Sequence, residues 1–139
     1  QQLIQYLASG AQLTIRGNRM YDTPGTKAMV QKWLNWFKSY RQILTSDIIH
    51  VSRPTGRDLD CILHVDPFGK YKGMAIVFNP THRDIEKELK LPLYYSGLKD
   101  SATVRKEGGS PVKYDLNDKG ELLMTVKIKA GGTSWFVLE

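Results

Sequence analysis

The sequence has little of what several classes of protein require. Cys61 is the only cysteine among 139 residues, which excludes an internal disulfide and a zinc site built from cysteines. No stretch approaches the ~18 uninterrupted apolar residues of a membrane span, so we expect no membrane partner. A whole (β/α)8 barrel needs ~200 residues or more, so this chain is too short to form one. It is long enough for one domain with its own hydrophobic core.

Acidic residues are also in the minority, and the formal net charge is +6. Residues 1–50 carry six Lys and Arg against two acidic residues, whereas residues 51–139 carry fourteen against twelve. The larger part is therefore nearly neutral, and the alternating signs over residues 84–90 are typical of a solvated face. We expect no nucleic-acid partner on this ground. A composition of 41% hydrophobic and 24% charged residues is that of an ordinary folded protein.

The first third of the chain predicts two helices with a short strand between them. Apolar residues at helical spacing over residues 1–8 end at Ser9-Gly10, which is a natural helix stop. Residues 11–15 are then predicted as the strand. Asp22 or Thr23 can cap a second helix, with Pro24 in its first turn. That helix has one wide apolar stripe, made of Met29, Val30, Trp33, Trp36, Phe37, Tyr40, Ile43 and Leu44.

Past Thr45 the hydrophobic period changes from 3.6 to 2 and stays there to the end of the chain. Short alternating segments are separated by turns rich in Gly, Pro and Asn, which indicates an antiparallel sandwich. The predicted fold class is thus α+β by content, with an N-terminal helix-strand-helix followed by an all-β antiparallel sandwich of seven or eight strands. The candidate strands are residues 47–52, 59–65, 73–79, 85–91, 102–107, 112–115, 121–130 and 134–138.

The predicted strand at 11–15 has no parallel partner elsewhere in the sequence. It resembles the last member of a series of βα units whose earlier members are absent. The chain also begins at Gln1 without a methionine or a secretory segment, so we expect it to be a piece of a longer protein. We predict a boundary after residue 45, with 1–45 as the end of such a series and 46–139 as a sandwich domain. The alternative is a small α+β protein whose N-terminal strand joins the sandwich.

Catalytic groups are not evident. Asp58 and Asp60 would face the same side of a strand, but we interpret them as a strand edge whose aspartates pair with Arg53 and Arg57. The scattered residues His50, His64 and His82 are interpreted as structural histidines, although strand pairing could bring the first two together. There is no Gly-rich phosphate loop, no His-Glu-x-x-His and no serine elbow. We therefore predict no catalytic residue, no metal and no cofactor in this segment.

The loop that opens the long helix is the best candidate for ligand contact. It follows a predicted strand and precedes a helix, the position from which parallel α/β folds build their sites. Arg16 and Arg19 could hold a carboxylate or orient a polar substrate, and Tyr21 could stack on it or donate a hydrogen bond. The alternative is a capped turn with surface arginines. Tyr94, Tyr95, Trp135 and Phe136 could stack on sugars, but aromatic residues in sandwich strands are more often core.

Several runs of the sequence form a recognisable set, namely residues 6–12, 15–17, 27–30, 40–50, 53–58, 63–67, 72–80 and 91–98. Together they resemble the C-terminal end of bacterial glycoside hydrolases related to the α-galactosidase clan. The resemblance implies that residues 1–45 are the last helix, strand and helix of a (β/α)8 catalytic barrel. It also implies that the rest is a C-terminal β-sandwich, with carbohydrate as the substrate of the parent enzyme. Arg16, Arg19 and Tyr21 would then lie in the eighth βα loop, and no catalytic position is matched.

The leading hypothesis is a C-terminal accessory region that packs against the catalytic barrel of the same parent chain and stabilises it. Alone, the fragment is expected to hydrolyse nothing. A second hypothesis is a stand-alone carbohydrate-binding module with Tyr94, Tyr95 or Trp135 exposed on a flat face. A third is an interaction domain that dimerises through the long helix. The sequence leaves the compartment open, although a polysaccharide-degrading parent would favour the periplasm or the exterior.

Overall fold

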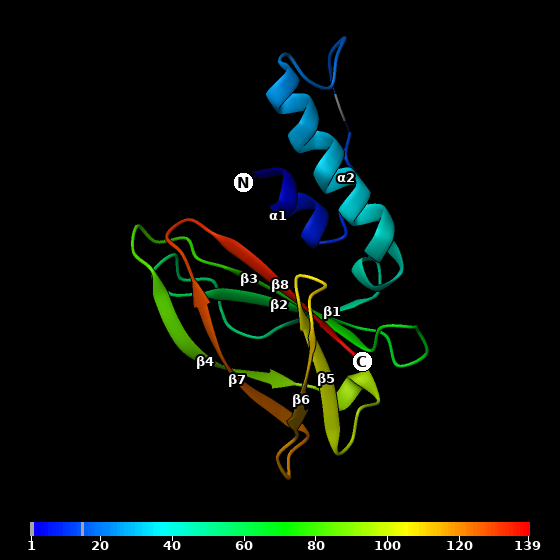
Figure 1. Cartoon of the computed structure of the whole chain (residues 1–139), viewed down its shortest axis with the longest axis vertical. Helices are drawn as coiled ribbons and strands as arrows, with labels where there is room; N and C mark the ends of the chain where they lie inside the picture. Colours follow the sequence, from blue (N-terminus) through cyan, green and yellow to red (C-terminus); the bar gives the residue numbers. More distant parts are fainter. Residues whose placement is uncertain (1, 15) are drawn as a thin grey trace.

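Two helices lie on one outer face of a two-layered β-structure in the computed structural model, which describes residues 2–14 and 16–139 (Figure 1). Both helices precede the eight strands in the described part of the chain. The helices are α1 (Gln2–Ala8) and α2 (Pro24–Leu44), and a 3-10 turn, η1, covers Tyr94–Ser96. The strands are β1 (Asp47–His50), β2 (Asp60–Val65), β3 (Gly73–Phe78), β4 (Ile85–Pro92), β5 (Ser101–Lys106), β6 (Pro111–Asp115), β7 (Glu121–Ile128) and β8 (Thr133–Leu138).

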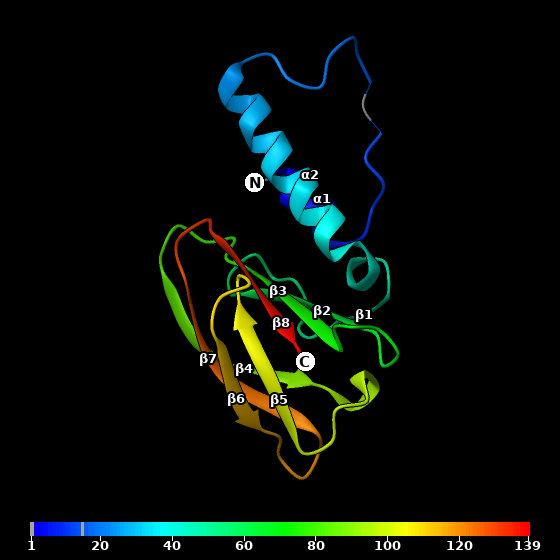
Figure 2. The ribbon, with the colours of Figure 1, turned by 45° about the vertical axis from the view of Figure 1, so that its right-hand side comes forward.

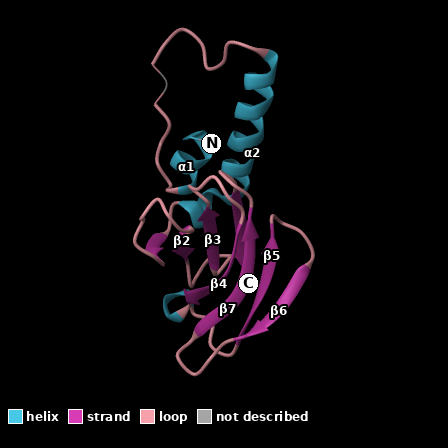
Figure 3. Cartoon of the chain, turned by 90° about the vertical axis from the view of Figure 1, so that its left-hand side faces the viewer, coloured by secondary structure: helices cyan, strands magenta, loops and turns pink. Residues whose placement is uncertain are grey.

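The strands form one sheet of six and one of two, and the paired strands are antiparallel. The larger sheet has the order β1-β2-β3-β8-β5-β6, and the smaller consists of β4 and β7. In the larger sheet β3 pairs with the last strand, with Ile76 opposite Trp135. Figure 3 shows the strands gathered below the two helices. The α+β content and the antiparallel sandwich are thus confirmed, and each of the eight predicted strands is found to within two residues at either end.

The central strand β3 is covered on both faces. Ala75 and Val77 belong to the core between the two sheets, whereas Met74 and Ile76 belong to the cluster beneath the helices. All four side chains are fully buried. Each large apolar side chain removed from water in this way contributes about 1.5–3 kcal/mol. The strand therefore joins the two hydrophobic clusters, and this explains why it is a continuous apolar run.

Aromatic side chains fill the contact between α2 and the sheet. Trp36 lies edge-on to Trp135 of β8, with ring centroids 5.9 Å apart. Tyr40 lies 5.1 Å from Trp135 and 5.5 Å from Tyr71, again between centroids. These contacts hold the C-terminal half of α2 on the larger sheet. The buried residues of α2 are Trp36, Ile43 and Leu44, all from that half.

Local signals account for the limits of α2. Thr23 is the N-cap, and its Oγ1 accepts a hydrogen bond from the Thr26 N–H at 3.2 Å. Pro24 occupies the first helical turn, where its missing N–H leaves no bond unmade. The helix ends at Thr45, whose N–H donates to the Arg41 carbonyl. Of the two predicted caps, the structure uses Thr23.

The predicted strand at residues 11–15 is wrong over the part that the structure describes. Residues 11–14 belong to no strand, and Ile15 lies outside the described residues. Figure 2 shows this segment as a loop that runs beside α2 toward its N-terminus. A strand needs a neighbour to satisfy its backbone groups, and none of the eight strands lies beside this segment. The alternative in which it joins the sandwich is therefore not what is observed.

Candidate functional site

The loop of residues 16–23, named here the arginine loop, lies at the end of α2 that is farthest from the sheets (Figure 2). Its side chains are largely in solvent. Arg19 Nε lies 3.9 Å from Asp22 Oδ1, and these side chains are 74% and 86% exposed. Such an exposed pair contributes little to stability. The side chains of the arginine loop are therefore accessible to a ligand.

Tyr21 and Arg19 lie in the same shallow surface hollow, together with Asn18 and Lys27. The Lys27 ammonium is 5.5 Å from the centre of the Tyr21 ring, which places a cation over the ring face. Arg16 is exposed but does not line this hollow. The structure thus brings together two of the three predicted residues and adds Lys27, which the sequence analysis did not single out. Two cations beside an aromatic ring can hold a carboxylate or another polar, electron-rich group.

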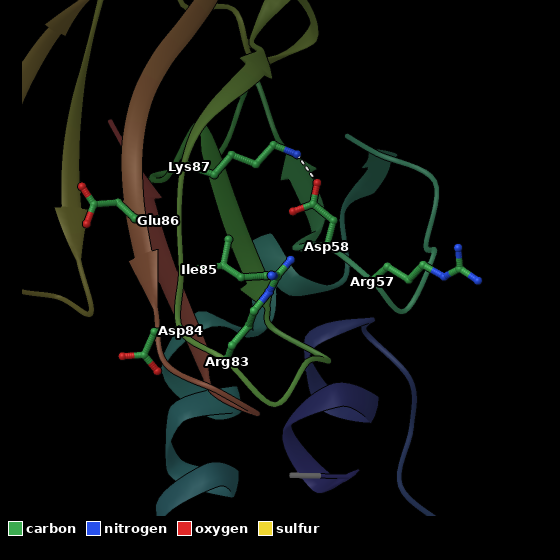
Figure 4. A pocket seen from close by; sticks show the side chains of 7 residues that line it. All are labelled: Arg57, Asp58, Arg83, Asp84, Ile85, Glu86 and Lys87. Carbon is green, nitrogen blue, oxygen red and sulfur yellow. Dashed lines mark hydrogen bonds and ion pairs between the residues drawn. The ribbon is translucent and has the colours of Figure 1, made fainter.

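Asp58, in the loop before β2, forms an ion pair with Lys87 on β4, and Figure 4 shows the two side chains meeting. Arg57 points away from this pair in the same view. The expected pairing of these aspartates with Arg53 and Arg57 is therefore wrong for Asp58. The hydrogen bond from Lys87 lowers the pKa of Asp58 below its usual value, helped by the Leu59 backbone N–H. The partner is 29 positions away, which local spacing could not reveal.

Asp60 lies in a different hollow, beside Gln5 and Asn79. Its Oδ1 is buried without a hydrogen-bond partner among the described residues, and burial raises the pKa of this carboxyl. The two aspartates therefore differ in their protonation behaviour. They line different hollows of the surface.

Strand pairing brings two of the histidines near each other, as the sequence analysis allowed. His50 stands opposite Ile62 and His64 opposite Ile48, so the two histidines are diagonal neighbours on one face of β1 and β2. Within residues 2–14 and 16–139 no group of three or more His, Cys, Asp or Glu residues could hold a metal ion. Cys61 is buried, and burial raises the pKa of its thiol to about 12. A buried thiol with so high a pKa is a poor nucleophile at neutral pH.

The aromatic candidates of the sandwich separate into two groups. Phe136 is core, and Trp135 packs against α2. Tyr94 and Tyr95 are 77% and 67% exposed and lie edge-to-face, with centroids 5.1 Å apart. The sequence analysis missed Phe68, which is 96% exposed. The signal was its place in the turn Pro67-Phe-Gly69, where a large apolar residue has no core to enter.

No helix among the described residues is long and apolar enough to cross a membrane. The sequence matches no protein-family model and no curated protein. The fold, in contrast, is similar to parts of larger solved structures. One, from Bacillus halodurans C-125, is provisionally named an α-N-acetylgalactosaminidase, and matches with a TM-score of 0.63 and 10% identity. Another, from Bacteroides fragilis NCTC 9343, is provisionally named an α-galactosidase or melibiase, and matches with a TM-score of 0.61 and 16% identity.

Both likenesses extend over nearly the whole of this chain but only a small part of the other. They cover 99% of this chain, against 29% of the Bacillus protein and 27% of the Bacteroides protein. The chain therefore spans less than a third of the length of these structures. At such identities the likeness establishes a shared fold, in which the helices and the sandwich occur together as one part of a larger molecule.

Proposed function

We propose that this chain is the C-terminal accessory region of an α-galactosidase-like glycoside hydrolase. In this proposal residues 1–45 are the end of the catalytic barrel, and residues 46–139 are a sandwich domain that braces it. The observation that carries the proposal is the unfinished packing of α2. None of its buried residues comes from the N-terminal half, although that half continues the apolar stripe.

The apolar stripe on the N-terminal half of α2 is only partly covered by the described residues. Met29 is 38% exposed, and Val30, Trp33 and Phe37 are only partly buried. Figure 1 shows this half of α2 projecting beyond the sheets. Aromatic and aliphatic side chains in this arrangement stabilise a protein only when another surface covers them. The missing part of a longer chain supplies such a surface.

The charge of α2 also supports a covering surface from the parent chain. The helix carries Lys27, Lys32, Lys38 and Arg41 and no acidic residue. The surface that covers it should therefore present acidic groups at its rim. The loop of residues 11–14 also lacks a neighbouring strand, although it runs beside α2. In the proposal, the covering part of the parent chain supplies that neighbour. A preceding barrel strand would provide both backbone hydrogen bonds and apolar cover.

Within the proposal, the arginine loop faces the substrate. Arg19, Lys27 and Tyr21 would bind a sugar or its leaving group from the end of the last barrel strand, and Arg16 would approach it from the same loop. None of these residues is a candidate acid or nucleophile. The proposal assigns the chemistry to earlier parts of the parent chain, so this chain alone should not hydrolyse p-nitrophenyl α-galactoside.

The first test is the DNA upstream of the codon for Gln1. The expected result is an open frame of several hundred residues with an alternating βα pattern. A stop codon or a signal peptide immediately upstream would contradict the proposal.

A second test compares two substitutions in the 139-residue chain and in the longer chain. Met29→Asp lies on the exposed stripe, whereas Gln31→Asp lies on the opposite, polar face of α2 and is the matched control. In the short chain both should change the free energy of unfolding by less than about 0.5 kcal/mol. In the longer chain Met29→Asp should cost about 3 kcal/mol or more, because it buries an unpaired charge. A neutral Met29→Asp in the longer chain would show that α2 is not covered there.

A further inference from the structure

Three aromatic side chains stand out from the surface at one end of the sandwich. Phe68, Tyr94 and Tyr95 are 96%, 77% and 67% exposed, more than any other large hydrophobic residue that the structure describes. They are named here the aromatic patch. Single exposed apolar residues need no explanation, but a group of three on adjoining loops indicates a binding surface.

The two loops that carry the aromatic patch touch each other. A Cβ on Gly97, which follows η1, would lie 3.3 Å from Pro67 Cβ in the loop between β2 and β3. Figures 1 and 2 both show these loops side by side, near the C-terminal end of α2. The three rings therefore belong to one region of the surface.

Hydrogen bonds hold both loops in place without help from the rings. Asp66 Oδ1 accepts from the backbone N–H groups of Phe68 and Gly69, at 3.1 and 2.9 Å. Lys72 Nζ donates to the Pro67 carbonyl at 2.8 Å. In η1 the buried Ser96 hydroxyl donates to the Leu93 carbonyl at 2.6 Å. The backbone positions of the three aromatic residues are thus held in place, which lowers the entropic cost of binding a ligand.

We propose that the aromatic patch binds a pyranose unit of a polysaccharide. The inference rests on the proposed function for its choice of ligand. The rings of Tyr94 and Tyr95 are nearly perpendicular, at 88°. A sugar ring can lay its C–H face on one of them while its hydroxyl edge meets the phenol groups, and Phe68 offers a second apolar face.

The surroundings of the aromatic patch favour a sugar over a protein partner. Its exposed neighbours include the charged residues Lys70, Lys99 and Asp100, beside Pro67. A stable protein interface has an apolar core ringed by polar groups, and no exposed Leu, Ile, Val or Met lies within these two loops. Charged groups around exposed rings are instead suited to hydrogen-bond sugar hydroxyls. The aromatic patch also lies at the opposite end of α2 from the arginine loop, so it is a separate site (Figure 2).

Affinity electrophoresis in gels containing galactomannan, xylan or soluble starch tests the proposal on the 139-residue chain. At least one polysaccharide should retard it. Phe68→Ala, Tyr94→Ala and Tyr95→Ala should each weaken the binding roughly fivefold, about the value of one aromatic contact. Tyr6→Ala is the matched control, because Tyr6 is also 60% exposed but lies on α1. Equal melting temperatures would show that each variant is folded.

Three results would overturn the assignment. The first is that none of the three polysaccharides retards the chain. The second is that the retardation is the same in the ring variants as in the unmodified chain. The third is binding to vesicles of phosphatidylcholine and phosphatidylglycerol that depends on the same rings, which would mark a membrane contact. These outcomes are independent of the upstream reading frame, so failure here leaves the accessory-region proposal standing.

Discussion

His64 Nε2 lies 2.6 Å from the carbonyl oxygen of Ala8, and this hydrogen bond ties the end of α1 to β2. The imidazole is fully buried between the helices and the sheet. Its Nδ1 has no hydrogen-bond partner among the described residues. Burial lowers the pKa of His64 below its usual 6.5, against the opposing effect of the Ala8 bond. At neutral pH the ring is therefore neutral, with Nε2–H donating to the carbonyl.

The free energy of unfolding should consequently fall in mild acid. Below pH 6.5 the unfolded chain binds a proton at His64 that the folded chain does not, so protonation favours unfolding. Above pH 6.5 the neutral His64 makes its full contribution to the free energy of unfolding. This contribution decreases as the pH falls from 6.5 to the lower pKa of the folded state. Urea unfolding between pH 8 and pH 4.5 should show this decrease. His64→Gln should reduce the slope, and exposed His82→Gln should leave it unchanged. Identical slopes in all three proteins would contradict the prediction.

Gly10 should be intolerant of a side chain. Its φ is +72°, and a Cβ there would lie 2.4 Å from the Leu44 carbonyl oxygen. Gly56 has nearly the same φ, +68°, with nothing within 4 Å of such a Cβ. Gly56→Ala should therefore lower the free energy of unfolding by only about 1–2 kcal/mol, which is the penalty for placing alanine in the left-handed conformation. Gly10→Ala should cost more, because α1 must move away from α2. Equal melting temperatures for the two variants would show that α1 and α2 are not closely packed.

Cys61 should be inert in the folded protein. With its thiol buried and its pKa raised to about 12, little thiolate is available to react. Ellman's reagent at pH 8 should therefore release almost no product until urea unfolds the chain, and then one equivalent. Rapid stoichiometric reaction under native conditions would mean that β2 opens readily.

The arginine loop should matter to a ligand and hardly at all to folding. Arg19→Ala and Tyr21→Ala remove side chains that pack on little of the described structure, so each should change the free energy of unfolding by less than about 0.5 kcal/mol. In the longer enzyme of the proposal the same variants should lower kcat/KM for a galactoside by about tenfold. A decrease of this size corresponds to the loss of about one hydrogen bond to the substrate. Unchanged kinetics together with unchanged stability would make the loop a plain capped turn.

Local chemistry determined where the strands and helices of this protein begin and end. Alternation along β7 and turn residues such as Gly120 act within a few positions, so they can be read in order along the chain. The Thr23 cap is equally local. The same reasoning failed at residues 11–14, because a strand does not depend on its own sequence alone. Its backbone groups need hydrogen bonds to a neighbouring strand, and no described strand lies beside this segment.

Only the tertiary structure decided which distant groups meet. The pairing of β3 with β8 joins segments some sixty positions apart, and the contacts of Asp58 with Lys87 and of His64 with Ala8 span 29 and 56 positions. Periodicity assigns a side chain to a face but does not say what covers that face. Burial of the apolar faces selected the strand order, and that order in turn placed Phe68, Tyr94 and Tyr95 on adjoining loops with no core left to fill.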